Sequence, residues 1–165
     1  MTDARPDRLW LARWEADRHA AVLGQALSAW DAQPAPTDLA TIESDIGLRQ
    51  LTDQILFRFM KLQDTLGERL IPATLAALAE PYEAWPMRDR IDRLEKLGFL
   101  DVESWLRWRE LRNRLAHEYP DEPELRHAQL LAAIAGAAAM LAAYRSWAAR
   151  LPASKGTSPG VSSCD

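Results

Sequence analysis

Apolar residues recur along this chain at spacings of three and four, the pattern of an α-helix with one buried face. The clearest run has steps of 3, 4, 4, 3, 4 and 4 and consists of Leu48, Leu51, Ile55, Phe59, Leu62, Leu66 and Leu70. This stripe predicts a long amphipathic helix that ends or kinks at Pro72, because proline lacks an N–H group and clashes with the preceding turn. Strand signals are scarce, with no sustained alternation of period two and no Asn-Gly hairpin dipeptide between alternating runs.

Capping and breaking residues set the expected ends of the neighbouring helices. A first helix is expected from about Asp7 to Trp30, followed by a proline loop of sequence QPAPTD. After the long stripe, a short helical piece, ATLAALAE, and the linker PYEAWP lead to the segment MRDRIDRLEKLG. Pro86 is placed to begin the helix of this segment and Gly98 to end it, since proline suits a first turn and glycine a C-terminal cap.

Two further helices are expected towards the C-terminus. Asp101 is placed as the N-cap of the helix DVESWLRWRELRNRLAHEY, which Pro120 should stop because the residue before a proline avoids the α region. An alanine-rich helix is expected from about Pro123 to Arg150, with these candidates for burial: Leu130, Ile134, Leu141 and Tyr144. Together the segments predict an all-α fold, a four- to five-helix antiparallel bundle. We assign residues 1–151 to one helical domain and residues 152–165, rich in Ser, Gly and Pro, to a disordered tail.

Composition agrees with one globular domain and suggests its compartment. The chain has 165 residues, of which 48% are hydrophobic and 27% charged, which is ordinary for a globular protein and unlike a disordered one. Its one cysteine, Cys164, cannot cross-link the fold or build a metal site, which predicts a reducing compartment. No apolar run approaches the roughly 18 residues of a membrane span, and the N-terminus lacks a signal peptide's apolar centre. We therefore expect a cytoplasmic protein with no membrane association.

Charge is unevenly distributed. The formal net charge of −4 argues against a generic nucleic-acid binder held by bulk positive charge. Between Trp105 and His117, however, one acid, Glu110, stands against four bases, Arg107, Arg109, Arg112 and Arg114, so the local balance is 4 − 1 = +3. This patch suggests a local phosphate site, although a solvated charged helix face explains the charges equally well.

Arg112 stands out because of its place on the expected helix. At about 100° per residue it falls within the apolar sector formed by Trp105, Trp108, Leu111 and Leu115. Burying an arginine there is costly unless an anion meets it. The structural explanation is an ion pair with a carboxylate on another helix, such as Glu43, Asp53 or Glu68. The functional explanation is a cleft or subunit interface in which the guanidinium binds phosphate through paired donors.

His117 follows Arg112 at the expected end of the same helix. On an ideal wheel it lies about 140° from Arg112, but a helix that frays beside Pro120 could bring the imidazole round. Histidine suits proton transfer near neutral pH, since its ordinary pKa is about 6.5. A phosphate-binding arginine beside such a histidine is a minimal set for cleaving RNA through its own 2′-hydroxyl. Spacing alone does not separate this site from an ordinary helix end.

The octet from Arg112 to Tyr119, with Asn113 after the arginine and His117 between, resembles the signature of the HEPN superfamily. The tyrosine two residues after the histidine makes it similar to the HepT-type toxins of bacterial toxin–antitoxin pairs. The segments RFMKLQDTLGERLIP and RLEKLG look like the preceding helices of that family, so the resemblance covers roughly residues 40–150. The motif is short, and the flanking helices therefore carry much of the weight.

The resemblance implies an all-helical homodimer that acts as a metal-independent endoribonuclease, the toxin of a type VII toxin–antitoxin pair. Arg112 would stabilise the charged phosphorane, His117 would be the general acid and base, and Asn113 would orient the site. Tyr119 would be the position at which a partner MNT-type nucleotidyltransferase antitoxin attaches AMP, which adds bulk and negative charge to a cleft meant for RNA. No cofactor and no metal are implied.

Other readings remain open. A catalytically silent HEPN subunit that binds nucleotide or substrate for a partner nucleotidyltransferase would carry the same motif, and a purely structural bundle would use Arg112 in an ion pair. A metal site is disfavoured because no HExxH spacing exists. His19, alone in a polar stretch, is expected at the surface. Tryptophans at helical spacing, such as Trp105 and Trp108, are expected to be core or interface anchors rather than base-stacking platforms.

Overall fold

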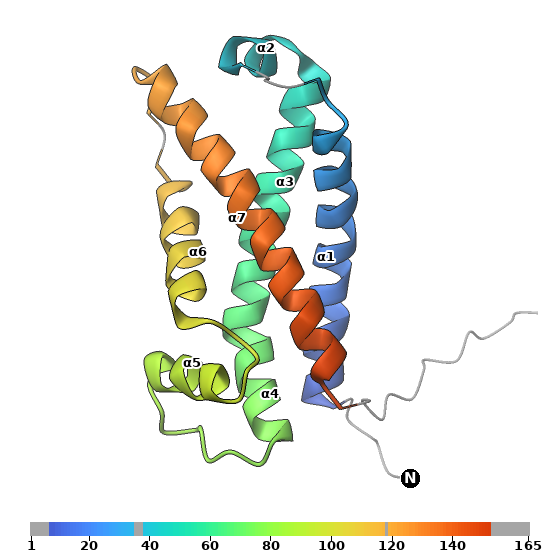
Figure 1. The fold of residues 1–165 in the computed structure, drawn as a ribbon, viewed down its shortest axis with the longest axis vertical. Helices are drawn as coiled ribbons and strands as arrows, with labels where there is room; N and C mark the ends of the chain where they lie inside the picture. Colours follow the sequence, from blue (N-terminus) through green and yellow to red (C-terminus); the bar gives the residue numbers. More distant parts are fainter. Residues whose placement is uncertain (1–6, 35–37, 118, 153–165) are drawn as a thin grey trace, which may run out of the picture.

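The computed structural model describes residues 7–34, 38–117 and 119–152, and every regular element among them is a helix. Figure 1 shows the long helices running antiparallel, with α7 crossing the face formed by its neighbours. The prediction of an all-α antiparallel bundle is confirmed. In chain order the elements are α1 (Arg8–Asp31), α2 (Leu39–Ser44), α3 (Ile46–Thr65), the π-helical turn η1 (Leu66–Leu70), α4 (Ile71–Ala77), α5 (Met87–Lys96), α6 (Val102–Arg114) and α7 (Pro123–Arg150).

The pair formed by α1 and α3 is the most extensively packed part of the bundle. α1 begins where expected, since the Asp7 side chain accepts a hydrogen bond from the Leu9 N–H at 3.0 Å. Its buried face is rich in small residues, which allow the two helices to approach closely: Leu9, Ala12, Ala16, Ala20, Leu23, Ala26 and Leu27. The predicted stripe of α3 is buried from Ile55 onwards, whereas Leu48 and Leu51 are half-buried. The short α2 was not expected from the sequence.

The expected break at Pro72 takes the form of a π turn. Proline has no N–H to donate to the carbonyl one turn earlier, so the regular ladder cannot continue through this position. The Ile71 N–H instead reaches back to the Leu66 carbonyl, and α4 starts with Pro72 in its first turn. The apolar stripe continues across the turn, because Leu66 and Leu70 are fully buried. The chain therefore bends without leaving the core, and Gly67 in the turn faces α6.

Capping residues position α5 and α6 as the sequence predicts. Pro86 precedes α5, and Gly98 follows it with φ of +76°, a left-handed conformation that glycine adopts without strain. Asp101 caps α6 by accepting a hydrogen bond from the Ser104 N–H at 2.8 Å. Trp105 and Trp108 are buried at 2% and 3% exposure, so they are core residues of this chain. α6 is thereby fixed against α3 and α7 by its aromatic face.

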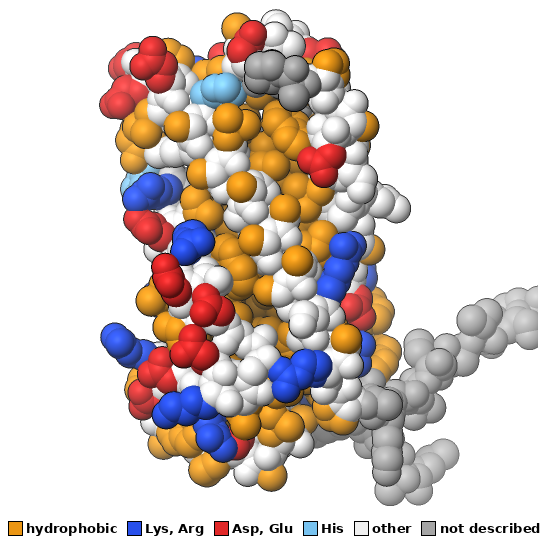
Figure 2. Space-filling model, in the orientation of Figure 1, with side chains coloured by type: hydrophobic (Ala, Val, Ile, Leu, Met, Phe, Trp, Pro, Cys, Tyr) orange, Lys and Arg blue, Asp and Glu red, His pale blue; other side chains and the backbone are white. Residues whose placement is uncertain are grey.

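α7 has the bounds expected from the sequence, but it is more apolar than expected. By length and composition it could cross a membrane, although 33% of its most apolar window is buried inside this fold and core helices of water-soluble proteins meet the same criterion. The statement that no apolar run approaches that length was therefore wrong for this alanine-rich helix. Its inner face includes Ile134, Leu141 and Tyr144 as predicted, while Leu130 is only half-buried. Hydrophobic side chains also run down the visible face over α7, with charged groups towards its margins (Figure 2).

Two sequence expectations about the periphery have different outcomes. His19 is not a free surface residue: it is half-buried, and its Nδ1 lies 3.0 Å from Nη1 of Arg58 on α3. Burial, and next the positive charge of Arg58, lower the pKa of this imidazole. The predicted disordered tail, residues 152–165, lies outside the described residues except for Pro152.

Candidate functional site

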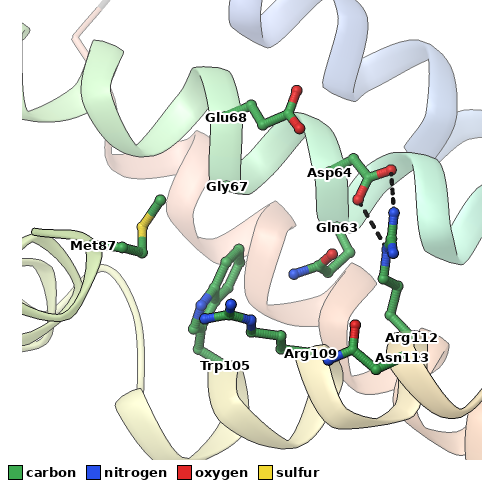
Figure 3. A pocket seen from close by; sticks show the side chains of 9 residues that line it. All are labelled: Gln63, Asp64, Gly67, Glu68, Met87, Trp105, Arg109, Arg112 and Asn113. Carbon is green, nitrogen blue, oxygen red and sulfur yellow. Dashed lines mark hydrogen bonds and ion pairs between the residues drawn. The ribbon is translucent and has the colours of Figure 1, made fainter.

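Arg112 projects from the last turn of α6 towards α3, where it meets a carboxylate. Its Nε donates to Oδ1 of Asp64 at 3.1 Å and its Nη2 donates to Oδ2 at 3.3 Å, a side-on bidentate pair (Figure 3). The carboxylate is none of the three named from the sequence, which overlooked Asp64. The two side chains are 39% and 32% exposed, so the pair is only partly withdrawn from water. Nη1 has no hydrogen bond to a described residue, which leaves donors for a further anion.

The Arg112–Asp64 pair lies in a pocket of about 360 Å³ between α3, the π turn and α6, with Met87 of α5 at its edge. Trp105, Arg109 and Arg112 share one face of α6 because their spacings are four and three. Two carboxylates and two guanidinium groups give the pocket a mixed charge. The lining residues are Gln63, Asp64, Gly67, Glu68, Met87, Trp105, Arg109, Arg112 and Asn113.

The helix that carries Arg112 ends earlier than the sequence suggested. α6 stops at Arg114 rather than continuing to Tyr119, and the next N–H groups make tighter bonds three residues back. The Ala116 N–H donates to the Asn113 carbonyl at 3.3 Å, and the His117 N–H donates to the Arg114 carbonyl at 3.1 Å. His117 therefore lies on a turn, where an ideal helical wheel does not describe its direction.

This turn borders a second and larger pocket of about 560 Å³, formed with α2, the start of α3 and the N-terminal half of α7. His117 and Tyr119 both line it, beside Leu115 and Pro120. His117 is exposed, and its imidazole makes no hydrogen bond with a described residue. Tyr119 is half-buried.

Arg126 of α7 holds the chain after this turn. Its Nη1 donates to the carbonyls of Tyr119 at 3.0 Å and Pro120 at 2.7 Å, and its Nη2 donates to Oε1 of Glu43 on α2 at 2.7 Å. The Arg126 guanidinium therefore links α7, α2 and the segment Tyr119–Pro120. Nothing in the local pattern of the sequence pointed to Arg126, because its acceptors are backbone carbonyls and a glutamate 83 residues away.

The structure divides the predicted site residues into two groups. Arg112 and Asn113 line the first pocket, and His117 and Tyr119 line the second. Within one chain the frayed helix end does not bring the imidazole into the arginine's pocket. Residues of the first pocket that the sequence did not point to are Gln63, Asp64 and Gly67, which belong to the long helix and its π turn. Glu68, named as a possible partner of Arg112, lines the pocket without forming that pair.

The described residues contain no group of three or more His, Cys, Asp or Glu side chains that could hold a metal ion. No family model, curated protein or solved structure matches this chain.

Proposed function

We propose that this protein is a metal-independent endoribonuclease, the toxin of a toxin–antitoxin pair, with Arg112 and His117 as catalytic residues. The observation that carries the proposal is the short segment from Arg112 to Tyr119, which combines a phosphate-binding group, a proton carrier and a modifiable hydroxyl. The orientation of Arg112 supports it, since Asp64 fixes the guanidinium through Nε and Nη2 while Nη1 makes no hydrogen bond with a described residue. The exposed imidazole of His117 supports it as well.

The proposed reaction is a transesterification within the RNA. The 2′-oxygen loses its proton to a base and bonds to phosphorus, while the bond from phosphorus to the 5′-oxygen breaks and that oxygen takes a proton from an acid. The products are a 2′,3′-cyclic phosphate and a 5′-hydroxyl end. Arg112 stabilises the negative charge on the phosphorane, and Asn113 at the rim of the same pocket helps to orient the phosphate. One imidazole cannot act as base and acid in the same step, so two copies of His117 suit this chemistry better than one.

A homodimer would supply both histidines, and we include it in the proposal. Trp105, Trp108 and Arg112 do not form the dimer surface in this proposal. The two tryptophans are buried within their own chain, and Arg112 has a partner in Asp64. The exposed leucines Leu106 and Leu131, at 54% and 42%, are better candidates for a self-association surface. Sedimentation at micromolar concentration should give twice the 18.6 kDa mass of the chain. A strict monomer would remove the second histidine.

The regulatory part of the proposal concerns Tyr119. A partner nucleotidyltransferase antitoxin would join its phenolic oxygen to the α-phosphorus of ATP, with release of pyrophosphate. The added AMP would lie beside His117, because both residues border the same pocket. Its bulk and negative charge would oppose the binding of RNA phosphate there.

A second function has its own support. Arg112 and His117 line different pockets in one chain, and Arg112 is already paired with Asp64. A catalytically silent subunit that binds a nucleotide or substrate for a partner nucleotidyltransferase would need no more than the first pocket. In that case the protein would bind nucleotides but would cleave no RNA at any stoichiometry.

Incubation with RNA in the presence of EDTA tests the main proposal. Wild-type protein should yield cyclic phosphate ends, and Arg112→Ala or His117→Ala should lower the rate by about 10² to 10⁴. Arg107→Ala is the matched control, since Arg107 lies exposed on the same helix in a surface pair with Glu103. Full activity in His117→Ala would refute the mechanism, and an inactive wild type on every RNA would favour the binding subunit.

A further inference from the structure

The first pocket is lined by two buried residues, Gln63 and Trp105, whose polar side-chain groups make no hydrogen bond with the part of the chain that the structure describes. Gln63 is 6% exposed, yet its side-chain amide makes no hydrogen bond with any described residue. Figure 3 shows this amide in the middle of the pocket, between the Arg112–Asp64 pair and Trp105. The residue is buried, but its amide lines the pocket and is not sealed from it. An amide that faces a cavity and makes no bond to the described chain can donate to and accept from a molecule held there.

Trp105 supplies the second unpartnered group. The residue is 2% exposed, and its indole Nε1 is buried without a hydrogen bond among the described residues. Arg109, one turn further along α6, is exposed and has no hydrogen bond or ion pair with the described chain. Its side chain can therefore move aside or bind an anion without breaking an existing contact.

The apolar wall of the pocket is formed by Trp105, Gly67 and Met87. The indole ring of Trp105 packs on Gly67 of the π turn, where an added Cβ would lie 3.2 Å from Cη2. Met87 closes the edge with its thioether side chain. π turns inside α-helices occur frequently at functional sites, because they displace one turn of side chains. Here the missing side chain at Gly67 lets the Trp105 ring pack directly against the turn.

The pocket is too large for a phosphate ion alone. At about 360 Å³ it lies within the range of small-molecule sites. It combines an apolar wall, an amide that can donate and accept, and guanidinium groups at the rim. A heterocyclic base joined to a sugar phosphate needs this set: edge hydrogen bonds for the base, apolar contact for its face and cations for its phosphate.

We propose that this pocket is a base-recognition subsite that holds the base of one nucleotide against Gln63 and the Trp105 wall, with its phosphate at Arg112 and Arg109. In the ribonuclease this nucleotide is a unit of the RNA next to the cleaved bond, and to that extent the inference rests on the proposed function. The same chemistry would hold a free nucleotide. The amide of Gln63 makes the subsite selective among bases, because only some base edges match its donor and acceptor together.

Binding measurements test the subsite without any cleavage. The probes are the four nucleoside 5′-monophosphates, inorganic phosphate, and short RNAs of one base each with 2′-O-methyl groups that block the attacking oxygen. Calorimetry on the wild type should show one or two bases bound about tenfold more tightly than the others. Preference in the RNAs alone would identify a strand subsite, and preference in the monophosphates as well would identify a site that also accepts free nucleotide.

The decisive variant is Gln63→Leu, which keeps the size of the side chain and removes its donors and acceptor. It should abolish the base preference while inorganic phosphate binds as before, and its melting temperature should not fall because the lost amide had no partner. Gln63→Glu, which keeps the acceptors and loses the donors, should change the order of preference. Gln50→Leu on the same helix is the control, since Gln50 is exposed and borders neither pocket.

The outcomes separate this inference from the proposed function. Equal binding of the four bases by the wild type, or a preference that survives in Gln63→Leu, would overturn the subsite even if RNA is cleaved. A preference that depends on Gln63 in a protein that cleaves no RNA would leave the subsite in place and overturn the ribonuclease. Binding that is lost equally for phosphate and all nucleotides in Gln63→Leu would show that Gln63 supports the pocket without reading the base.

Discussion

Removing the Arg112 side chain should affect activity far more than stability, and the geometry of its ion pair gives the reason. The two partners are 39% and 32% exposed, so water screens the pair and competes for both groups. Pairs of this kind contribute about 1 kcal/mol or less. Arg112→Ala should therefore lower the free energy of unfolding by about 1 kcal/mol, which is a shift of about 2–4 °C in melting temperature for a chain of this length.

The expected loss of transition-state stabilisation in Arg112→Ala is several times larger than the expected loss of unfolding free energy. A rate decrease of about 10² to 10⁴ corresponds to about 2.7–5.5 kcal/mol of transition-state stabilisation. The same preparation should be used for urea unfolding followed by circular dichroism and for the cleavage assay. Asp64→Asn should destabilise the protein as little as Arg112→Ala does. It should lower cleavage less, because it loosens the guanidinium without removing it.

The stability measurement can refute this reasoning. A loss of more than about 3 kcal/mol in Arg112→Ala is typical of a broken buried ion pair. Arg112 would then be a structural residue, and any loss of cleavage would follow from unfolding. Arg107→Ala again serves as the control, since its pair with Glu103 is more exposed and should contribute even less.

Three further predictions concern other parts of the chain. Thr74→Val should cost about 1–3 kcal/mol of unfolding free energy, because the buried Trp147 Nε1 donates to the Thr74 hydroxyl at 3.1 Å; Thr74→Ser should retain that bond, and equal stability of Thr74→Val and wild type in urea would exclude the role. Burial and Arg58 hold the pKa of His19 below its ordinary value, so the unfolded chain binds this proton first and stability should fall as the pH drops below about 6.5. Unfolding at pH 7.5 and 5.5 should show a smaller fall in His19→Gln, and an identical fall would contradict this assignment. Co-expression with a partner nucleotidyltransferase should add AMP at Tyr119, which intact-mass and peptide spectrometry detect; AMP elsewhere, or full silencing of Tyr119→Phe, would exclude that switch.

The helices could be predicted from the sequence because their signals are local. The stripe from Leu48 to Leu70 follows a period that only a helix satisfies, and Asp7 and Asp101 cap their helices through bonds to N–H groups two or three residues away. Gly98 ends α5 for an equally local reason, its left-handed backbone. Each signal lies within one or two turns, so no knowledge of the fold is needed to read it.

The end of α6 shows where local rules fail. Pro120 predicts a helix stop at Tyr119, yet α6 ends at Arg114. Beyond Arg114 the chain makes short-range turns. Arg126, which belongs to α7, donates hydrogen bonds to the carbonyls of Tyr119 and Pro120. These hydrogen bonds form only when α7 packs against the end of α6, so the residues near Pro120 cannot by themselves show where α6 ends.

By itself the sequence determined the helical class, most helix boundaries, the core stripes and the motif from Arg112 to Tyr119, because periodicity, caps and motifs are properties of neighbouring residues. Only the tertiary structure decided which anion meets Arg112, that His117 borders a different pocket, and that Gln63 is buried without a hydrogen bond to any described residue. Asp64 lies 48 residues from Arg112, and many carboxylates in the chain satisfy the same charge requirement. The choice among them depends on how α3 and α6 pack together, which no local pattern encodes.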